Sequence, residues 1–397
     1  MESKSSEYLN KLRYSLPWLV RYPFAHARSL FREKRSGPKS IVFVIANHFE
    51  PSWKPGGLLD IDTQRRRVDT YYELARKTGE AVRDADGTKF RHTNFFPGEQ
   101  YDRQILEKLA GMQAEGLGDV EIHLHHGVDA PDTPENLRSA LTEFRDVLAS
   151  EHKCLSRMDG LGDPMYAFVH GNHALANSAG GMYCGVDNEM EILRETGCYA
   201  DMTLPTAPDR SQVPMFNKIY ECGLPISEKA PHRKGKSVHT LGGPLQLPLI
   251  FTGPLVLDWA DWSRRLIVPR IDNGELDGNR SADPSRLGRW IDANIIVEGQ
   301  PEWVFIKLSC HGFVDRDQQA CIGDDARRFF SDVIEKGETS NDYKVYFATA
   351  REACNMVFAA MDGMTGSPGV FRDYRLKPVM REESVSLTPR RSSAPAT

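Results

Sequence analysis

The sequence predicts an α/β protein, a distorted (β/α) barrel of mostly parallel strands in a single domain with an insertion near 206–246. Three observations predict this class. Short apolar runs alternate with segments of helical periodicity, and unusual polar residues collect where the apolar runs end. The length of 397 residues also suits one large barrel or two ordinary domains.

The expected strands are mostly continuous apolar runs, which is typical of parallel strands buried on both faces. The first, SIVFVIANHFEP, is apolar until its last residues. Strands or short strand-and-loop segments are expected at 40–51, 90–102, 120–127, 165–172, 199–205, 249–257, 303–312 and 343–350.

Helices are expected between these strands, because the intervening segments have helical spacing and polar outer positions. The segment at 133–151 begins with a Thr-x-x-Asn start signal, and Gly116 ends the helix before it. The expected helices are 63–82, 102–116, 133–151, 186–197, 284–296, 324–337 and 351–361.

The remaining segments divide the chain into an arm, a barrel and a tail. Residues 1–39 form a basic arm, 40–365 the barrel, and 379–397 a Ser- and Pro-rich tail that we expect to be disordered. Residues 206–246 have little periodicity and many Pro, Gly and basic residues. We expect them to be an insertion over the barrel mouth.

Net charge argues against nucleic acid as a partner. The chain carries a formal charge of −5, whereas non-specific nucleic-acid binding needs a basic surface. The charge is uneven, because residues 1–40 contain nine Lys or Arg against three Glu. Leu, Trp, Phe and Tyr lie among these cations, as in a segment that contacts a membrane surface. Pro17 and Pro23 would break any long helix there. An arm that packs on the barrel, or a mobile leader, is the alternative.

Cysteine spacing and the lack of a long apolar run indicate a cytoplasmic protein. The seven cysteines are scattered, and no pair has CxxC spacing. Free thiols fit a reducing compartment. No signal peptide is expected, and no run approaches the ~20 apolar residues of a membrane span. Peripheral attachment at the inner face of the membrane through the arm stays open.

Histidines collect at the expected strands and strand ends. Eight of the twelve occur there, and scattered surface histidines would not be distributed in this way. They are His48, His92, His123, His125, His126, His170, His173 and His311. In parallel α/β folds the site lies at the carboxyl ends of the strands, so these residues are the candidates for its chemistry.

The stretch VEIHLHHGVD is the densest of these segments. Alternation places His123 and His125 on the same side of the strand, while His126 and Asp129 belong to the following turn. A strand-end histidine and a carboxylate four residues later can reach one ion, with His48 on the neighbouring strand as third ligand. Two imidazoles, a carboxylate and an open position are typical of a catalytic zinc site.

The order of these motifs resembles that of the NodB-like polysaccharide deacetylases, metal-dependent enzymes with a distorted barrel. Their motifs correspond to VIANHFEP, EIHLHHGVD, AFVHGN, DWADW and IKLSCHG of this chain, over roughly residues 40–360. The fourth motif, Asp-x-x-Asp-Trp, matches letter for letter, and the third matches only by place. The resemblance is closer to a divergent branch with HFEP and HG signatures.

The resemblance implies a divalent metal, expected to be zinc, held by His48, His125 and Asp129. It implies that His311 is the general acid for the leaving amine, and that a metal-bound water attacks the acetyl carbonyl. Asn47 stands where the family keeps its base, although an amide cannot accept a proton at neutral pH. Glu50 is the nearest carboxylate that could replace it, and His126 is the second candidate.

Four further residues are expected to contact substrate. They are His126, His170, Asn172 and Asp261.

The function expected from this resemblance is metal-dependent removal of an acetyl group, by cleavage of an amide bond, from an acylated amino sugar or glycan intermediate. A nucleotide-linked or lipid-linked sugar facing the cytoplasm suits the expected location. Two alternatives stay open. One is a catalytically impaired barrel that acts as a glycan-binding or scaffold protein, which Asn47 favours. The other is a metal hydrolase that acts on a phosphoester or glycosidic bond.

Overall fold

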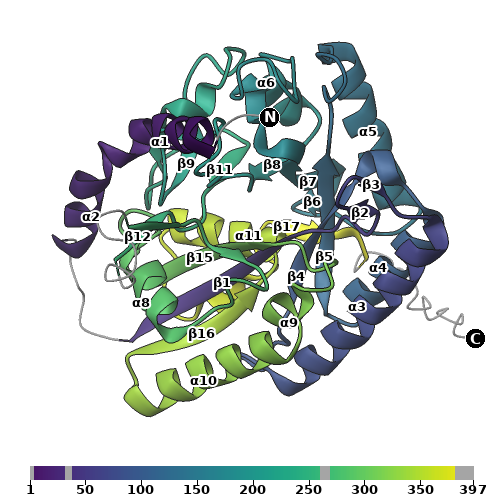
Figure 1. The fold of residues 1–397 in the computed structure, drawn as a ribbon. Helices are drawn as coiled ribbons and strands as arrows, with labels where there is room; N and C mark the ends of the chain where they lie inside the picture. The colour runs from purple at the N-terminus through teal and green to yellow at the C-terminus, as the bar shows by residue number, and fades with distance from the viewer. Residues whose placement is uncertain (1–3, 32–37, 260–268, 381–397) are drawn as a thin grey trace, which may run out of the picture.

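A curled, mostly parallel sheet organises the chain in the computed structural model, which describes residues 4–31, 38–259 and 269–380 (Figure 1). Its strands pair in the order β10-β9-β11-β8-β7-β5-β4-β1-β15-β14, with β16 beside β1 and β6 joining β7 to β17. The strands are β1 Lys39–His48, β4 His92–Pro97, β5 Gly118–Leu124, β6 Ser156–Met158, β7 Leu161–His170, β8 Cys198–Asp201, β9 Ile219–Cys222, β10 Gly235–Ser237, β11 Leu249–Phe251, β14 Glu275–Leu276, β15 Trp303–Cys310, β16 Tyr343–Ala348 and β17 Leu376–Pro378.

Two small antiparallel ribbons and a set of helices complete the described fold. The ribbons pair β2 (Trp53–Lys54) with β3 (Gly57–Leu58), and β12 (Val256–Asp258) with β13 (Arg270–Asp272). The helices are α1 Lys4–Leu19, α2 Tyr22–Phe31, α3 Ile61–Ala81, α4 Arg103–Ala114, α5 Pro134–Ser150, α6 Glu189–Glu195, α8 Pro284–Asp292, α9 Gln318–Cys321, α10 Asp324–Ser340 and α11 Ala350–Met361.

The α/β class and the mostly parallel sheet are confirmed, but the strand pairings of the described residues do not close a complete barrel. The reason lies at the two edges that would have to meet. One edge is β10, which comes with β9 from the insertion at 206–246 and pairs antiparallel with it, and the other edge is β14, which pairs with β15. The insertion therefore extends the sheet as well as lying near its rim.

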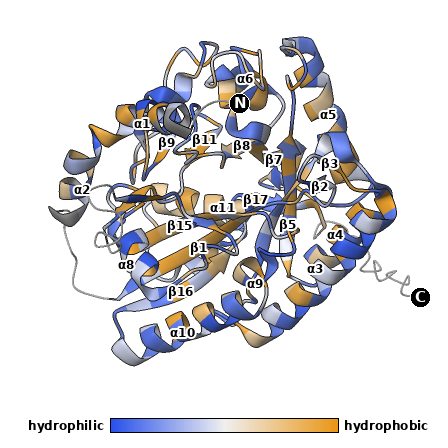
Figure 2. Ribbon diagram, in the orientation of Figure 1, coloured by the Kyte–Doolittle hydropathy of each residue, from blue (hydrophilic) through white to orange (hydrophobic). Residues whose placement is uncertain are grey.

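Helices α3 and α10 cover the outer face of the sheet. Alternation along β1 sends Phe43 and Asn47 outward, where Phe43 packs edge-on against Phe330 of α10, with ring centroids 5.1 Å apart. Asn47 donates to the hydroxyl of Tyr71 on α3. Figure 2 shows the resulting pattern, a hydrophobic β1 at the centre and outer helices with both hydrophilic and hydrophobic positions.

Helix α11 packs against the concave face of the sheet. Every one of its residues is buried, and it contacts β1, β7 and β8. Its amino end is fixed by a capping box between Thr349 and Glu352, and by an ion pair of 3.1 Å from Arg351 Nε to Asp119 Oδ2 on β5. Because α11 fills this part of the interior, polar chemistry is left to the carboxyl ends of the strands.

The N-terminal arm packs on the body of the protein. Trp18 of α1 is fully buried, and its ring lies 5.8 Å from that of Phe216 in the insertion. The hydroxyl of Tyr22 accepts a hydrogen bond from the backbone N–H of Leu257. The packed arm is thus the alternative that the structure favours for the described residues 4–31. No helix in the described ranges combines the length and apolar character that a membrane crossing requires.

The expected C-terminal tail lies almost wholly outside the described residues. Only its first two residues, 379 and 380, are described, and Val379 is buried, with its N–H donating to Leu155 O.

The buried His92 makes the stability of the fold sensitive to acid. Its ring lies between the hydroxyl of Tyr71, 2.7 Å from Nδ1, and the carbonyl of Cys321, 3.0 Å from Nε2. Burial lowers the pKa of His92 to about 3. The unfolded chain therefore binds a proton between that pH and about 6.5 that the folded protein excludes. Stability that is present above pH 6.5 is lost as the pH falls toward 3.

We expect His92→Gln to flatten this acid loss, because glutamine keeps a neutral polar side chain without a titrating imidazole. At most about 1.4 kcal/mol per pH unit should disappear from the slope of unfolding free energy against pH. Urea unfolding between pH 4 and 7 measures it, with exposed His239→Gln as the matched loss of one imidazole. Identical slopes for wild type and His92→Gln would contradict the assignment.

Candidate functional site

The carboxyl ends of β1, β5 and β15 bring together one carboxylate and four histidines. We call this group the rim cluster, and it consists of His48, Glu50, His123, His125 and His311. Parallel pairing explains the convergence, because β1 lies between β15 and β4 and β5 follows β4. Strands that run in one direction end at one edge of the sheet, so Glu50 and His311, far apart in sequence, meet there.

Glu50 is the centre of the rim cluster. Its Oε1 lies 3.0 Å from His125 Nε2 and 3.6 Å from His123 Nε2, and its Oε2 lies 3.5 Å from His311 Nε2. The ring of His48 is packed between those of His123 and His311, at centroid distances of 5.0 and 4.7 Å. Two sets of ligand atoms are close enough to share an ion, one with His48 and His311 and one with His123 and His125.

Contacts at the Nδ1 atoms of His123 and His125 fix the orientation of the two rings. His123 Nδ1 lies 2.7 Å from the carbonyl of Val169, which fixes that nitrogen as the protonated donor. Its Nε2 is buried and lies 3.6 Å from Glu50 Oε1, just beyond hydrogen-bond distance. His125 Nδ1 lies 2.7 Å from Glu99 Oε1. Histidines that bind metals are held in this way, so the donor set fits a divalent cation.

Electrostatics give the same picture. Burial raises the pKa of Glu50, but His123 and His125 outweigh that effect and hold it well below its usual range. Burial lowers the pKa of His125, yet Glu50 and Glu99 raise it to about 10. Without a metal, His125 thus keeps a proton between two carboxylates. A bound metal would displace that proton from Nε2.

Burial, reinforced by His311 and His123, lowers the pKa of His48 well below its usual range, so its ring is neutral at pH 7. His311 lies at the outer limit of the cluster, with 37% of its side chain exposed and its Nδ1 3.8 Å from Glu275 Oε1.

Asn47 does not face the rim cluster, although the sequence places it at the position of a catalytic base. Alternation along β1 turns its side chain to the outer face, where Nδ2 donates to Tyr71 and to Asn94 at 3.2 Å. Its Oδ1 accepts from the N–H of Gly312 at 2.9 Å. Asn47 therefore positions the turn that carries His311, and an amide serves this purpose because it both donates and accepts.

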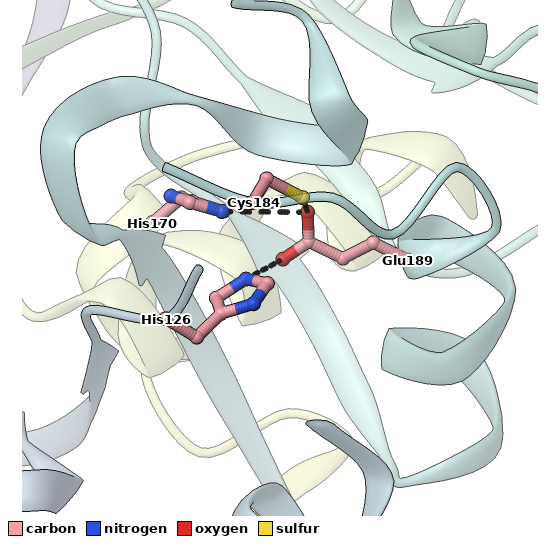
Figure 3. Close-up of side chains that lie close together, drawn as sticks. All are labelled: His126, His170, Cys184 and Glu189. Carbon is pink, nitrogen blue, oxygen red and sulfur yellow. Dashed lines mark hydrogen bonds and ion pairs between the residues drawn. The ribbon is translucent and has the colours of Figure 1, made fainter. Parts of the chain in front are cut away.

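A second group, which we call the buried cluster, lies beside the first. It consists of His126, His170, Cys184 and Glu189, and all four residues are buried (Figure 3). His126 and His170 therefore face Glu189, rather than an open surface where substrate would be contacted. His125 and His126, adjacent in sequence, contribute to different clusters.

Asp129 and Asn172 are not members of either cluster. Asp129 is exposed and belongs to none of the metal-candidate groups formed by the described residues, so Glu50 supplies the carboxylate expected from it. Asn172 is exposed, directly after the end of β7. Asp261 lies outside the described residues. Asp258, the first residue of the same motif, forms an ion pair of 3.0 Å with Arg289.

Sequence reasoning missed several participants. Glu99 follows β4 at the same edge as the other strand ends, and that position was a usable signal. Cys184 and Glu189 lie in a loop and a short helix, without paired cysteine spacing to indicate a metal site. His123, which alternation places on the same side of β5 as His125, is buried and also faces Glu50.

Comparison with known proteins does not identify a family. No family model matches the sequence, and no curated protein matches it. The deacetylase resemblance therefore rests on motif order alone.

The two proposed sets of metal ligands predict different metal contents for two variants. If Glu50, His123 and His125 hold the ion, His123→Ala should remove about one equivalent of bound metal, because losing one of three protein ligands leaves a poor site. Asp129→Ala should keep the wild-type metal content, since that carboxylate is exposed. Metal analysis of dialysed proteins measures both. Loss of metal in Asp129→Ala with retention in His123→Ala would favour the sequence-derived ligand set instead.

Proposed function

We propose that the protein is a metal-dependent hydrolase with a distorted deacetylase-type barrel, which removes the acetyl group from an acylated amino sugar or related glycan intermediate. The observation that carries the proposal is the position of Glu50, a carboxylate among four histidines where parallel strands end. The motif order supports the reaction class, and the open, partly exposed side of the cluster at His311 supports access for a substrate.

Glu50, His123 and His125 are the residues that would hold the ion, because the latter two are oriented by Val169 and Glu99. Two imidazoles and a carboxylate fit zinc with an open position. When bound, such an ion polarises the acetyl carbonyl and makes a water molecule nucleophilic at neutral pH.

Two histidines of the rim cluster, His48 and His311, are not among the proposed metal ligands. His311 is partly exposed at the rim, where its imidazole can give a proton to the leaving amine, and Glu275 orients the ring from the far side. His48 lies behind it, buried against His311, and because its pKa is lowered its ring is neutral at pH 7, so the proton for the leaving amine comes from His311. Glu50 lies near both His125, a proposed ligand, and His311, so it connects the metal-binding histidines with the proton donor.

The place of Asn47 weakens the argument for a catalytically impaired barrel. The missing carboxylate at position 47 would matter if that side chain faced the site, but it faces α3. Glu50 provides a carboxylate at the rim in its place. The seven cysteines, all buried and free, are consistent with the cytoplasmic location that we propose.

Acetate release from a panel of N-acetylated free, nucleotide-linked and lipid-linked sugars tests the proposal. We expect wild-type protein loaded with zinc to release acetate from at least one of them. His311→Ala should lower kcat about 10²–10⁴-fold with metal content unchanged, because it removes a proton donor and no ligand. His239→Ala, exposed and outside the rim cluster, is the matched control. Absence of release by metal-loaded wild type across the panel would contradict the proposal.

A peripheral membrane contact through the arm is also proposed, because α1 carries an exposed apolar stripe. Leu9, Leu12 and Leu16 are 63, 44 and 49% exposed at helical spacing, and basic residues lie among them. We expect Leu12→Asp/Leu16→Asp to reduce co-sedimentation with anionic vesicles at least tenfold, since each buried leucine contributes about 1.5–3 kcal/mol. Leu161→Asp, at an even more exposed leucine outside the arm, should bind as wild type. Equal binding by all three would contradict the contact.

A further inference from the structure

We propose that His126, His170, Cys184 and Glu189 form a closed zinc site that fastens the loop after β7 to the sheet. This site is separate from the rim cluster and stands independently of the proposed hydrolase activity. Its four side chains come from the turn after β5, the end of β7, the following loop and the first residue of α6 (Figure 3).

The distances among the ligand atoms suit one small cation. Glu189 Oε1 lies 3.2 Å from His126 Nε2, while Oε2 lies 3.5 Å from His170 Nε2 and 3.4 Å from Cys184 Sγ. All four ligand atoms lie within 4.8 Å of one another. Ligands at zinc distances of roughly 2.0–2.3 Å occupy tetrahedral corners about 3.3–3.8 Å apart, so only small movements are needed.

Both histidines are oriented so that Nε2 faces inward. His126 Nδ1 lies 3.0 Å from Asp132 Oδ2, and Asp132 is itself held by N–H groups of Thr133 and Asn136. His170 Nδ1 donates to the carbonyl of Gly171. A carboxylate or carbonyl behind the ring is the arrangement that fixes the tautomer of a metal-binding histidine.

One imidazole nitrogen at the centre of the buried cluster has no hydrogen-bond partner. His170 is fully buried, and its Nε2 has no hydrogen-bond partner while it points toward the Glu189 carboxylate. The Glu189 carboxylate accepts from His126, from Cys184 and from the N–H of Ala176, so the buried His170 Nε2 is the atom left without a partner, and a bound cation would give it one. A soft thiolate with two imidazoles and a carboxylate selects zinc over magnesium or calcium.

The surrounding backbone is built to bring the loop to this point. Gly127 has φ +64°, and a Cβ there would lie 2.1 Å from the carbonyl oxygen of Cys184, so only glycine permits this approach. Asn172, Ala176 and Asn177 also have positive φ, a backbone conformation that persists only where surrounding contacts hold it. Glu189 Oε2 accepts from the N–H of Ala176 and so ties the ligand set to this strained segment.

The lack of an open coordination position indicates a structural role for this zinc site. All four ligands are protein side chains and all are buried, whereas a catalytic zinc site keeps one position open for water or substrate. The loop that this site fastens carries His173, whose ring lies 6.0 Å from that of His48 in the rim cluster. Metal in the buried cluster would therefore hold one wall of the rim cluster in place.

Cobalt substitution of the full-length protein tests the site, because the rim cluster contains no thiolate. We expect wild-type protein reconstituted with Co²⁺ to show a thiolate-to-cobalt charge-transfer absorption in the near ultraviolet. Zinc analysis should give about two equivalents per chain, one for each cluster. His123→Ala should lose one equivalent of zinc and keep the charge-transfer absorption, which separates this site from the proposed function.

Cys184→Ser should abolish the charge-transfer absorption and lose one equivalent of zinc, with far-ultraviolet circular dichroism as the check that the chain folds. Cys222→Ser, another buried cysteine in β9, is the matched control and should retain both signals. The proposal is overturned if wild-type protein shows no thiolate-to-cobalt absorption, because that measurement needs no variant. It is also overturned if folded Cys184→Ser keeps the wild-type zinc content, which would mean that the cluster is an ion network without metal.

Discussion

Both candidate sites depend on how β5 ends between β4 and β7. The parallel register pairs His123 with Val169 and Leu124 with His170, so the last residues of β5 lie beside the last residues of β7. The same register puts the Val169 carbonyl within hydrogen-bond distance of His123 Nδ1. After the last residue of β5 that pairs with β7, the chain turns, and the side chains of His125 and His126 point to different clusters. A register shift of one residue would exchange these directions and dismantle both clusters at once.

The rest of the fold keeps that strand end fixed and accessible. Helix α11 fills the concave face, and its Arg351 pairs with Asp119 near the start of β5. Asn47 hydrogen-bonds to α3, to Asn94 of β4 and to the turn after β15. The ends of β1, β4 and β15 are therefore held together on the outer face of the sheet. Gly171 allows the His125 ring to lie against the backbone, because a Cβ there would come within 2.5 Å of the imidazole. These contacts preorganise a polar group that would otherwise be costly to hold together.

The two clusters both contain histidines around a carboxylate but differ in exposure, and that difference indicates different roles. The rim cluster is partly open at His311, which is 37% exposed. The buried cluster has a fourth side-chain ligand and no exposed member. A site with an open position can exchange water and substrate, whereas a closed one can only hold structure. Because His125 and His126 are neighbours, a rigid buried cluster limits the motion of the rim cluster.

The sequence by itself determined the α/β class, the strand ends as the place of the unusual polar residues, and the histidines that would gather there. These features follow from local periodicity and from the rule that parallel strands end at one edge. The Thr133 start of α5 was likewise readable, because an N-cap is a local interaction.

Only the tertiary structure decided which of these residues meet. Glu50 rather than Asp129 joins the histidines, Asn47 faces outward, and Cys184 and Glu189 reach His126 from a loop and a helix. Such contacts depend on strand register, on the direction of a turn and on the path of a loop, and none of these is a local property of the residues involved.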